Sequence, residues 1–366
     1  MAVPLIDIHR QHDPIQDKLD AAIKAVFAHG RFILGPEVKE LEERIAKLCR
    51  VKHAIGVASG TDALQLALHA AGVGPGDEVI TSAFSFFASA GVISRLGAKP
   101  VFAEIDIDTF NLDPAKLERR ITDKTKAIMP VHLFGQCADM DAIFSIALNH
   151  KVKIIEDAAQ AIGSIYYGRP AGSLGDAGCF SFFPTKNLGC AGDGGMIVTN
   201  NDELAETMRM LRVHGGKSEY HHDIVGYNSR LDTLQAAILN VKLDYLQAWT
   251  EARRKNAARY DKLLADVPVV TPVVAEERYH IFHQYTIMTD KRDELQAHLH
   301  KKGVGCKVYY PIPFHMQKCF ADLGYTNGQF PLAEKAGNQV LSLPIFGEMT
   351  EAEQDEVVAA IKEFFS

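Results

Sequence analysis

The segment Ser181–Gly189 has the sequence SFFPTKNLG and places Lys186 between aromatic residues and a glycine. A lysine needed only for solubility is usually on a polar helix face. A lysine that must lose its proton and attack a carbonyl needs a partly desolvated site instead. The preceding run, Gly178–Phe182, has the apolar composition of a buried strand. We therefore interpret Lys186 as a candidate nucleophile just beyond a strand.

The same alternation of short apolar runs and longer helical stretches extends over about residues 50 to 200. Continuous apolar strands separated by helices predict an α/β fold, with a mostly parallel sheet covered on both faces. About seven strands are expected, at His53–Ala58, Glu78–Thr81, Pro100–Ile105, Lys126–Leu133, Val152–Glu156, Gly178–Phe182 and Met196–Thr199.

The composition changes in the last third of the chain. A long polar helix is predicted over about Ser229–Leu264 and would act as a connector. Beyond it, the pattern predicts a strand, a helix and a strand at Tyr279–Thr289, Glu294–Lys302 and Val304–Tyr310, then a final helix over Glu351–Phe365. We therefore expect a large domain over residues 1–250, which includes an N-terminal arm, and a smaller α+β domain over residues 251–366.

The overall composition excludes several classes of protein. The formal net charge of −7 gives no electrostatic reason to expect nucleic-acid binding. No run of eighteen apolar residues predicts a membrane span, and the N-terminus lacks the pattern of a signal peptide. None of the six cysteines forms a C-x-x-C pair. Reduced thiols in the cytoplasm are therefore expected, with Cys179 and Cys190 as packing residues.

Acidic and amide residues follow another predicted strand. The run Glu156-Asp157-Ala158-Ala159-Gln160 begins where that strand ends. A carboxylate at Asp157 could keep a pyridinium nitrogen protonated, and this pairing with a lysine Schiff base is the signature of pyridoxal cofactors. Gln160 could reach the phenolic oxygen of the same ring. Asp157 could equally cap a helix that begins at Ala158.

Two further segments could bind such a cofactor. Ser59-Gly60-Thr61-Asp62 joins a strand to a helix, so its backbone N–H groups could bind a phosphate, to which Ser181 could also donate. An ordinary capped helix is the commoner meaning of this motif. Phe86 follows the second strand and could stack on a planar ring, although a core phenylalanine is the simpler interpretation.

The predicted connector begins with Asn228-Ser229-Arg230-Leu231-Asp232. Asn228 could cap that helix, and Arg230 in an exposed first turn could bind an anionic substrate or form an ion pair with Asp232. The histidines at 221–222 and the acids at 106 and 108 lack a matching set of ligands at suitable spacing, so no metal site is predicted.

Taken together, these segments resemble the DegT/StrS-type sugar aminotransferases, which are pyridoxal phosphate enzymes with the aspartate-aminotransferase fold (fold type I). The resemblance runs from ILGPE, which begins at Ile33, to LSLP, which begins at Leu341. Its markers stand in the family's order: SGTDAL from Ser59, VGPGDEVI from Val73, EDAAQ from Glu156, SFFPTK from Ser181, NSRLD from Asn228 and YPIP from Tyr310.

The resemblance implies a role for each marker. Lys186 would bind the cofactor as a Schiff base and then shuttle a proton, and Asp157 would pair with the ring nitrogen. The other cofactor contacts implied are Gln160 to the phenolic oxygen, Phe86 on the ring, and Gly60, Thr61 and Ser181 around the phosphate. Asn228 would reach the cofactor phosphate of the neighbouring subunit, which implies a homodimer with shared active sites.

The segment after Lys186 is typical of relatives that act on 3-keto sugars. The closest likeness is to 3-aminotransferases of UDP-2-acetamido-2-deoxy-3-oxoglucuronate, which serve amino-sugar and surface-polysaccharide biosynthesis with glutamate as amino donor. That likeness implies substrate contacts at Gly30, Phe32, Thr185, Arg230, Tyr309 and Tyr310. Phe32 replaces the family's tyrosine, and Tyr309 replaces its histidine.

Three other activities remain open at this point. Amination could occur at C4 of a 4-keto-6-deoxy sugar. The related sugar dehydratases carry histidine in place of the lysine, so Lys186 argues against dehydration. The third alternative is a regulatory role, in which the protein binds the cofactor without turnover. The chain shows no obvious DNA-binding appendage, which argues against this role.

Overall fold

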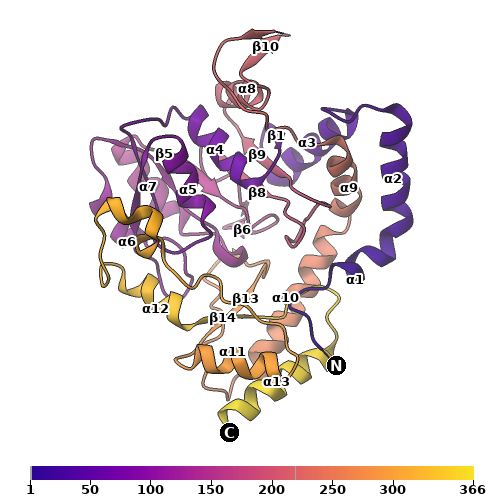
Figure 1. Ribbon diagram of the computed structural model, residues 1–366, viewed down its shortest axis with the longest axis vertical. Helices are drawn as coiled ribbons and strands as arrows, with labels where there is room; N and C mark the ends of the chain where they lie inside the picture. Colours follow the sequence, from indigo (N-terminus) through magenta and orange to yellow (C-terminus); the bar gives the residue numbers. More distant parts are fainter. Residues whose placement is uncertain (1, 219) are drawn as a thin grey trace.

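The computed structural model describes residues 2–218 and 220–366. Its centre is a seven-stranded sheet in the order β1-β9-β8-β5-β4-β2-β3 (Figure 1). Every strand of this sheet overlaps one of the runs predicted from the sequence, which confirms the α/β fold class. The strands are β1 His53–Val57, β2 Glu78–Ser82, β3 Lys99–Ala103, β4 Thr125–Met129, β5 Lys153–Asp157, β8 Ala177–Ser181 and β9 Gly195–Thr199.

All neighbouring strands are parallel except β9, which is antiparallel to both β1 and β8. The carboxyl ends of the other six strands therefore meet at one edge of the sheet. The amino end of β9 lies at the same edge, because its direction is reversed. Loops that leave this edge are where parallel sheets bind ligands.

Helices cover both faces of the sheet, and each face has its own cluster of buried apolar residues. One cluster packs α3 Pro36–Cys49, α7 Met140–His150 and α9 Thr233–Leu243 against the strands. The other packs α4 Gly60–Ala70, α5 Ala88–Arg95 and α8 Asp202–Leu211. The large buried area of each face is the main stabilising term of the fold.

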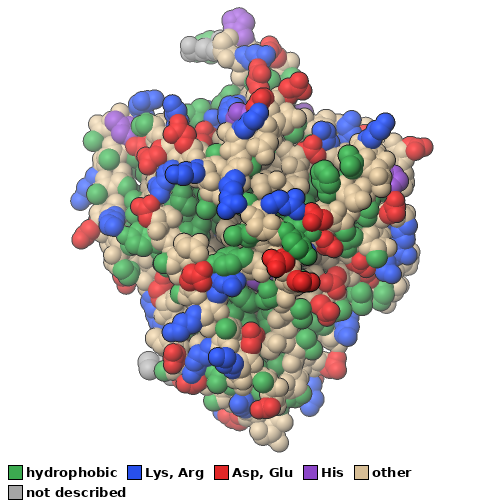
Figure 2. All heavy atoms as spheres, turned by 180° about the vertical axis from the view of Figure 1, so that it is seen from behind, with side chains coloured by type: hydrophobic (Ala, Val, Ile, Leu, Met, Phe, Trp, Pro, Cys, Tyr) green, Lys and Arg blue, Asp and Glu red, His purple; other side chains and the backbone are tan. Residues whose placement is uncertain are grey.

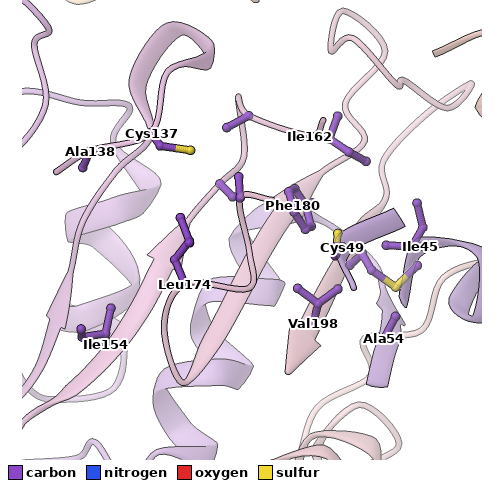
Figure 3. Packing of buried hydrophobic residues seen from close by; sticks show 14 of the residues in the cluster. Ile45, Cys49, Ala54, Cys137, Ala138, Ile154, Ile162, Leu174, Phe180 and Val198 are labelled. Carbon is purple, nitrogen blue, oxygen red and sulfur yellow. The ribbon is translucent and has the colours of Figure 1, made fainter. Parts of the chain in front are cut away.

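Four of the cysteines, Cys49, Cys137, Cys179 and Cys190, are packing residues in this core. Figure 3 shows Cys49 and Cys137 among apolar side chains such as Ile45 and Ala138. All six cysteines are free thiols, and Cys179 and Cys190 are buried, as predicted. Burial raises the pKa of the Cys190 thiol to about 11, so it remains protonated at neutral pH.

The prediction of one long helix over Ser229–Leu264 is wrong. Residues 228–232 are held extended, because Asn228 pairs with Val213 and Asp232 pairs with Ile33 in isolated β-bridges. Two helices follow, α9 and then α10 Leu246–Leu263. They are separated at Tyr245, whose N–H donates to the carbonyl of Lys242, three residues back.

The C-terminal part forms the lower lobe of Figure 1. It contains the antiparallel pair β13 Tyr285–Met288 and β14 Val340–Leu343, with α11 Arg292–Lys301 and α13 Glu351–Phe365. The expected strand Val304–Tyr310 is wrong: its backbone pairs first with Val3 and then with Ser342, so no continuous ladder forms. Val3 also lies in the apolar cluster of this lobe. The domain boundary near residue 250 stays a prediction.

The remaining elements are short or peripheral. A hairpin, β10 Gly216–Ser218 and β11 His221–His222, projects beyond the rest of the molecule in Figures 1 and 2. Figure 2 also shows charged side chains of both signs mixed over that face. The others are α1 Ile8–His12, α2 Gln16–His29, α6 Pro114–Leu117, α12 Pro331–Gln339, β6 Ile165–Tyr166, β7 Arg169–Pro170, β12 Arg278–Tyr279 and the 3-10 turns Asp13–Ile15, Glu118–Arg120, Leu133–Gly135, Phe314–Met316 and Lys318–Leu323.

Within residues 2–218 and 220–366, no helix combines the length and the apolar character needed to cross a bilayer.

Candidate active site

A cavity of about 750 Å³ lies beyond the carboxyl edge of the sheet. It is lined by loops that follow β1, β2, β5 and β8, together with the segment 307–317 of the C-terminal lobe. Most of the residues predicted from the sequence meet here. They are Gly60, Thr61, Phe86, Asp157, Gln160, Ser181, Thr185, Lys186, Tyr309 and Tyr310.

Lys186 lies in a tight turn that follows β8. Its backbone N–H donates to the carbonyl of Phe183 at 2.8 Å, which folds the turn back on itself. Burial lowers the pKa of the Lys186 ammonium to about 8, although the negative charge of Asp157 opposes this shift. An appreciable fraction of the amine is therefore unprotonated near neutral pH, which is the state that attacks a carbonyl carbon.

Asp157 is the last residue of β5 and is buried. Its Oδ2 accepts a hydrogen bond from the Ser89 hydroxyl at 2.7 Å, and its Oδ1 accepts one from the Ala159 N–H at 3.2 Å. Burial raises the pKa of this carboxyl group, while both hydrogen bonds and Lys186 act against the rise. Residues 158–163 form turns, so the alternative of a helix cap is wrong.

The turn after β1 serves two purposes. Ser59 is the cap of α4, because its hydroxyl accepts from the Asp62 N–H at 3.0 Å. Gly60 and Thr61 then form the first turn of α4 and line the cavity beside Ser181. A Cβ on Gly60 would come within 2.5 Å of the Ser181 Cβ, so only glycine allows this approach. The helix start and the two hydroxyls suit a phosphate.

Gln160 and Phe86 both contact Tyr310. The Gln160 amide accepts from the Phe134 N–H at 2.7 Å and donates to the Tyr310 hydroxyl at 2.9 Å, which fixes its orientation. The Phe86 ring is 54% exposed at the cavity, and its centroid lies 6.0 Å from that of Tyr310. Phe86 is therefore not a core residue, and an aromatic face is available to a planar ligand.

Two predicted residues line a separate hollow of about 320 Å³. Asn228 and Arg230 share it with Asp193, and no ion pair between Arg230 and Asp232 occurs among the described residues. The helix that Asn228 was expected to cap begins only at Thr233, so neither that cap nor an Arg230 in the first turn is present. Asp193 lines both the hollow and the main cavity.

Gly30 and Phe32 also lie outside the main cavity. Gly30 ends α2 in the left-handed conformation, with φ of +68°. The Phe32 ring is 41% exposed and meets Phe27 edge to face at 5.4 Å. Its carbonyl accepts from the Thr233 N–H at 3.0 Å, which places this segment next to the Arg230 hollow.

Several residues of the site were missed by sequence reasoning. Ser89 carried no signal, because a serine inside a short helix is common. Asp193 lies in the glycine-rich run 192–195, whose pattern indicates a tight turn and no more. His283 and Lys307 come from the C-terminal lobe and line the cavity through tertiary packing alone. The Lys307 ammonium lies 5.5 Å from the Tyr309 ring centroid.

The donor set of the cavity fits pyridoxal phosphate. The partly unprotonated lysine suits the aldehyde of that cofactor, and the buried carboxylate held by two hydrogen bonds suits its ring nitrogen. The helix start with its adjacent hydroxyls suits the phosphate, and the exposed aromatic ring suits the face of the cofactor ring. Among residues 2–218 and 220–366, no group of three or more His, Cys, Asp or Glu residues could hold a metal ion.

The chain is similar over nearly its whole length to several known proteins. The chain is 56% identical over its whole length to a pleiotropic regulatory protein of Geobacillus stearothermophilus, covering 99% of that protein. It is 48% identical to the UDP-2-acetamido-2-deoxy-3-oxo-D-glucuronate aminotransferase of Pseudomonas aeruginosa, covering 98% of this chain and 99% of that protein. The crystal structure of NtdA from Bacillus subtilis with bound pyridoxamine phosphate superposes with a TM-score of 0.94 at 35% identity, covering 99% of this chain and 85% of that one.

The model of the DegT/DnrJ/EryC1/StrS aminotransferase family matches residues 13–362. The match includes every predicted cofactor and substrate position, from Gly30 to Tyr310. This chain therefore belongs to the DegT/DnrJ/EryC1/StrS aminotransferase family and is a transaminase that uses pyridoxal phosphate.

Proposed function

We propose that this transaminase moves an amino group from glutamate to the C3 keto group of a nucleotide-diphosphate sugar. The observation that carries the proposal is Lys186, whose pKa is lowered to about 8, facing the same cavity as Asp157. The name of the Pseudomonas aeruginosa relative supports a 3-keto sugar as substrate. The product would be an amino sugar for a surface polysaccharide, and the free thiols favour a cytoplasmic reaction.

Pyridoxal phosphate, when bound, supplies an aldehyde that carries the amino group and a ring that takes up electrons. Gly60, Thr61 and Ser181 would hold its phosphate, and Phe86 would cover the ring. Asp157 would keep the ring nitrogen protonated, and the fixed amide of Gln160 would reach the phenolic oxygen. Each of these residues lines the cavity.

Lys186 would then act as the base and acid of the reaction. Its amine would accept a proton from the carbon that bears the amino group and would return that proton to the aldehyde carbon of the cofactor. A pKa near the working pH is suited to both transfers, because each protonation state is then well populated.

The substrate side of the site involves two groups of residues. Thr185, Tyr309 and Tyr310 line the cavity, whereas Asn228 and Arg230 line the separate hollow. Gly30 and Phe32 form the second group with them, because the Phe32 carbonyl accepts from the N–H of Thr233, next to the hollow-lining Asp232. We propose that the working form is a homodimer in which the second group of one subunit completes the cavity of the other. Arg230 would bind an anionic part of the nucleotide sugar, and Asn228 the cofactor phosphate.

Two alternatives keep some support. Amination at C4 would use the same residues, because the catalytic groups act on either keto position. Regulation without turnover is supported by the relative from Geobacillus stearothermophilus, which is named a pleiotropic regulatory protein.

The decisive experiment has two stages. Purified protein loaded with pyridoxal phosphate is mixed with glutamate, and the absorbance of the cofactor should change to that of its amine form. UDP-linked 3-keto and dTDP-linked 4-keto sugars are then added, and NMR identifies the carbon that receives nitrogen. A 4-amino product would replace the C3 assignment with the C4 alternative. Unchanged absorbance with glutamate, or full reaction in Lys186→Ala, would refute the proposed mechanism.

A further inference from the structure

Lys242 is a lysine with no exposed surface, in the last turn of α9. Its ammonium lies 2.5 Å from the carbonyl oxygen of Gly189 and 3.0 Å from His12 Nε2. The Trp249 ring centroid lies 5.9 Å away. Among the described residues, no carboxylate lies within ion-pair distance of it. Burying a lysine without a carboxylate partner lowers the stability of the fold, so we expect its contacts to have a functional role.

The contact with Gly189 reaches the segment that carries Lys186. Two residues lie between the two positions, and the turn is compact: a Cβ on Gly189 would come within 2.4 Å of the Pro184 carbonyl oxygen. The Cys190 N–H donates to the Phe182 carbonyl at 2.8 Å and closes the loop. The backbone on both sides of Lys186 is therefore tied into one compact loop.

This loop is held from two sides. On one side, the Asn187 amide donates to the Ile281 carbonyl at 3.2 Å, and its oxygen lies 3.2 Å from His283 Nδ1. On the other side, the Gly189 carbonyl accepts from Lys242. Only the second contact comes from a charged donor, and such hydrogen bonds are the stronger kind.

We infer that Lys242 is a positioning residue for Lys186: by holding the Gly189 carbonyl, it fixes the loop from which the reactive amine projects. The inference rests on the proposed function, because it takes Lys186 as the covalent anchor of the cofactor. Burial lowers the pKa of Lys242 to about 8, but either protonation state can donate a hydrogen bond to the carbonyl.

The test measures attachment of the cofactor rather than turnover alone. Wild-type protein, Lys242→Met and His12→Ala are freed of cofactor, mixed with pyridoxal phosphate, and reduced with borohydride at set times. Mass spectrometry then gives the fraction of Lys186 that carries the cofactor. We expect attachment in Lys242→Met to be about tenfold slower, because the amine is displaced from its attack position. His12→Ala removes the other polar contact of Lys242 and should attach the cofactor at the wild-type rate.

Other outcomes would overturn the inference. Wild-type attachment in Lys242→Met would mean that the lysine only stabilises the fold, and equal slowing in His12→Ala would trace the effect to the N-terminal segment. If Lys242→Met does not fold, Lys242→Gln is measured instead. Its polar end is one bond too short to reach Gly189, so wild-type attachment there would also refute the role. No attachment in the wild type would instead refute the proposed function.

Discussion

The hydroxyl of Ser89 lies 2.7 Å from Oδ2 of Asp157 and joins the first helical turn after β2 to the end of β5. Both side chains are buried. Burial raises the pKa of Asp157, and the hydrogen bond from Ser89 is the strongest of the contacts that oppose the rise. Ser89 therefore helps to keep the carboxylate of Asp157 negatively charged. This carboxylate would pair with the ring nitrogen of the cofactor.

Replacing Ser89 by alanine should weaken catalysis through Asp157. Loss of a hydrogen bond to a charged group costs about 1.5–3 kcal/mol, so kcat should fall by about tenfold or more. The pKa of Asp157 should rise further, because burial is then less opposed. The acidic limb of the pH profile of kcat should consequently move to higher pH.

Ser85 provides a matched control for this prediction. Its hydroxyl lies 3.1 Å from that of Ser89, in the same buried pocket, but has no direct contact with Asp157. Ser85→Ala should leave the pH profile in place, and Ser89→Thr should restore most of the activity. An unchanged acidic limb in Ser89→Ala would show that the carboxylate does not depend on this hydroxyl.

A second prediction concerns the charge state of Lys186 in protein freed of its cofactor. The pKa of Lys186 is lowered to about 8 by burial, and only the unprotonated amine reacts with an aldehyde. The rate of cofactor attachment should therefore rise with pH and reach half its maximum near pH 8. Stopped-flow absorbance over a range of pH measures this midpoint.

The same measurement on Asp157→Asn tests the cause of the shift. The negative charge of Asp157 favours the ammonium and so raises the pKa of Lys186 against the effect of burial. Its removal should move the midpoint to lower pH. A midpoint that moves to higher pH would contradict this electrostatic account of the site.

A third prediction concerns the attachment of the N-terminal segment to the C-terminal lobe. Arg10 donates to both oxygens of Glu353, at 2.9 and 2.7 Å, and lowers the pKa of Glu353 from 4.5 to about 2. A depressed carboxyl pKa adds stability above the unfolded value, and this contribution is lost as pH falls from 4.5 toward 2. Glu353→Gln should lower the free energy of unfolding by about 1–2 kcal/mol at neutral pH.

Urea unfolding of wild type and variant over this pH range checks the prediction. The difference between the two proteins should shrink as pH falls, because Glu353 becomes protonated in the wild type too. Glu351→Gln is the control, since that carboxylate is exposed and its ion-pair contacts within residues 2–218 and 220–366 are long, at 3.9 and 4.0 Å. A difference that stays constant down to pH 2 would contradict the assigned role of the ion pair.

Local sequence determined how well each part of the structure could be predicted. Each strand of the large sheet contains a short apolar run, and that run marks the position of the strand in the sequence. Asp157 and Lys186 follow such strands, and parallel strands bring their carboxyl ends to one edge. The segment 304–310 looked equally strand-like, but its backbone partners come from two distant parts of the chain. Local pattern carries no information on that pairing.

The same limit applies to residues that act through other residues. Lys242 sits in a helix where an exposed lysine would be unremarkable, and only the packing of α9 against the Gly189 loop buries it. The resemblance implied that Arg230 and Phe32 contact the substrate, yet within one chain neither residue lines the cavity. A single sequence does not reveal which subunit a residue serves.

A last prediction tests whether that separation reflects a shared site. If Arg230 serves the partner's cavity, Lys186→Ala and Arg230→Ala homodimers should each be inactive with the nucleotide sugar. Mixed and refolded together, they should form heterodimers in which one cavity carries both mutations and the other carries neither. With random pairing of the two chains in a twofold dimer, about a quarter of wild-type activity should return.

Lys186→Ala mixed with Asp157→Asn is the control, because both residues line one chain's own cavity and no intact site can form. Activity that stays absent in the first mixture, with heterodimers present by native mass spectrometry, would mean that Arg230 acts within its own subunit.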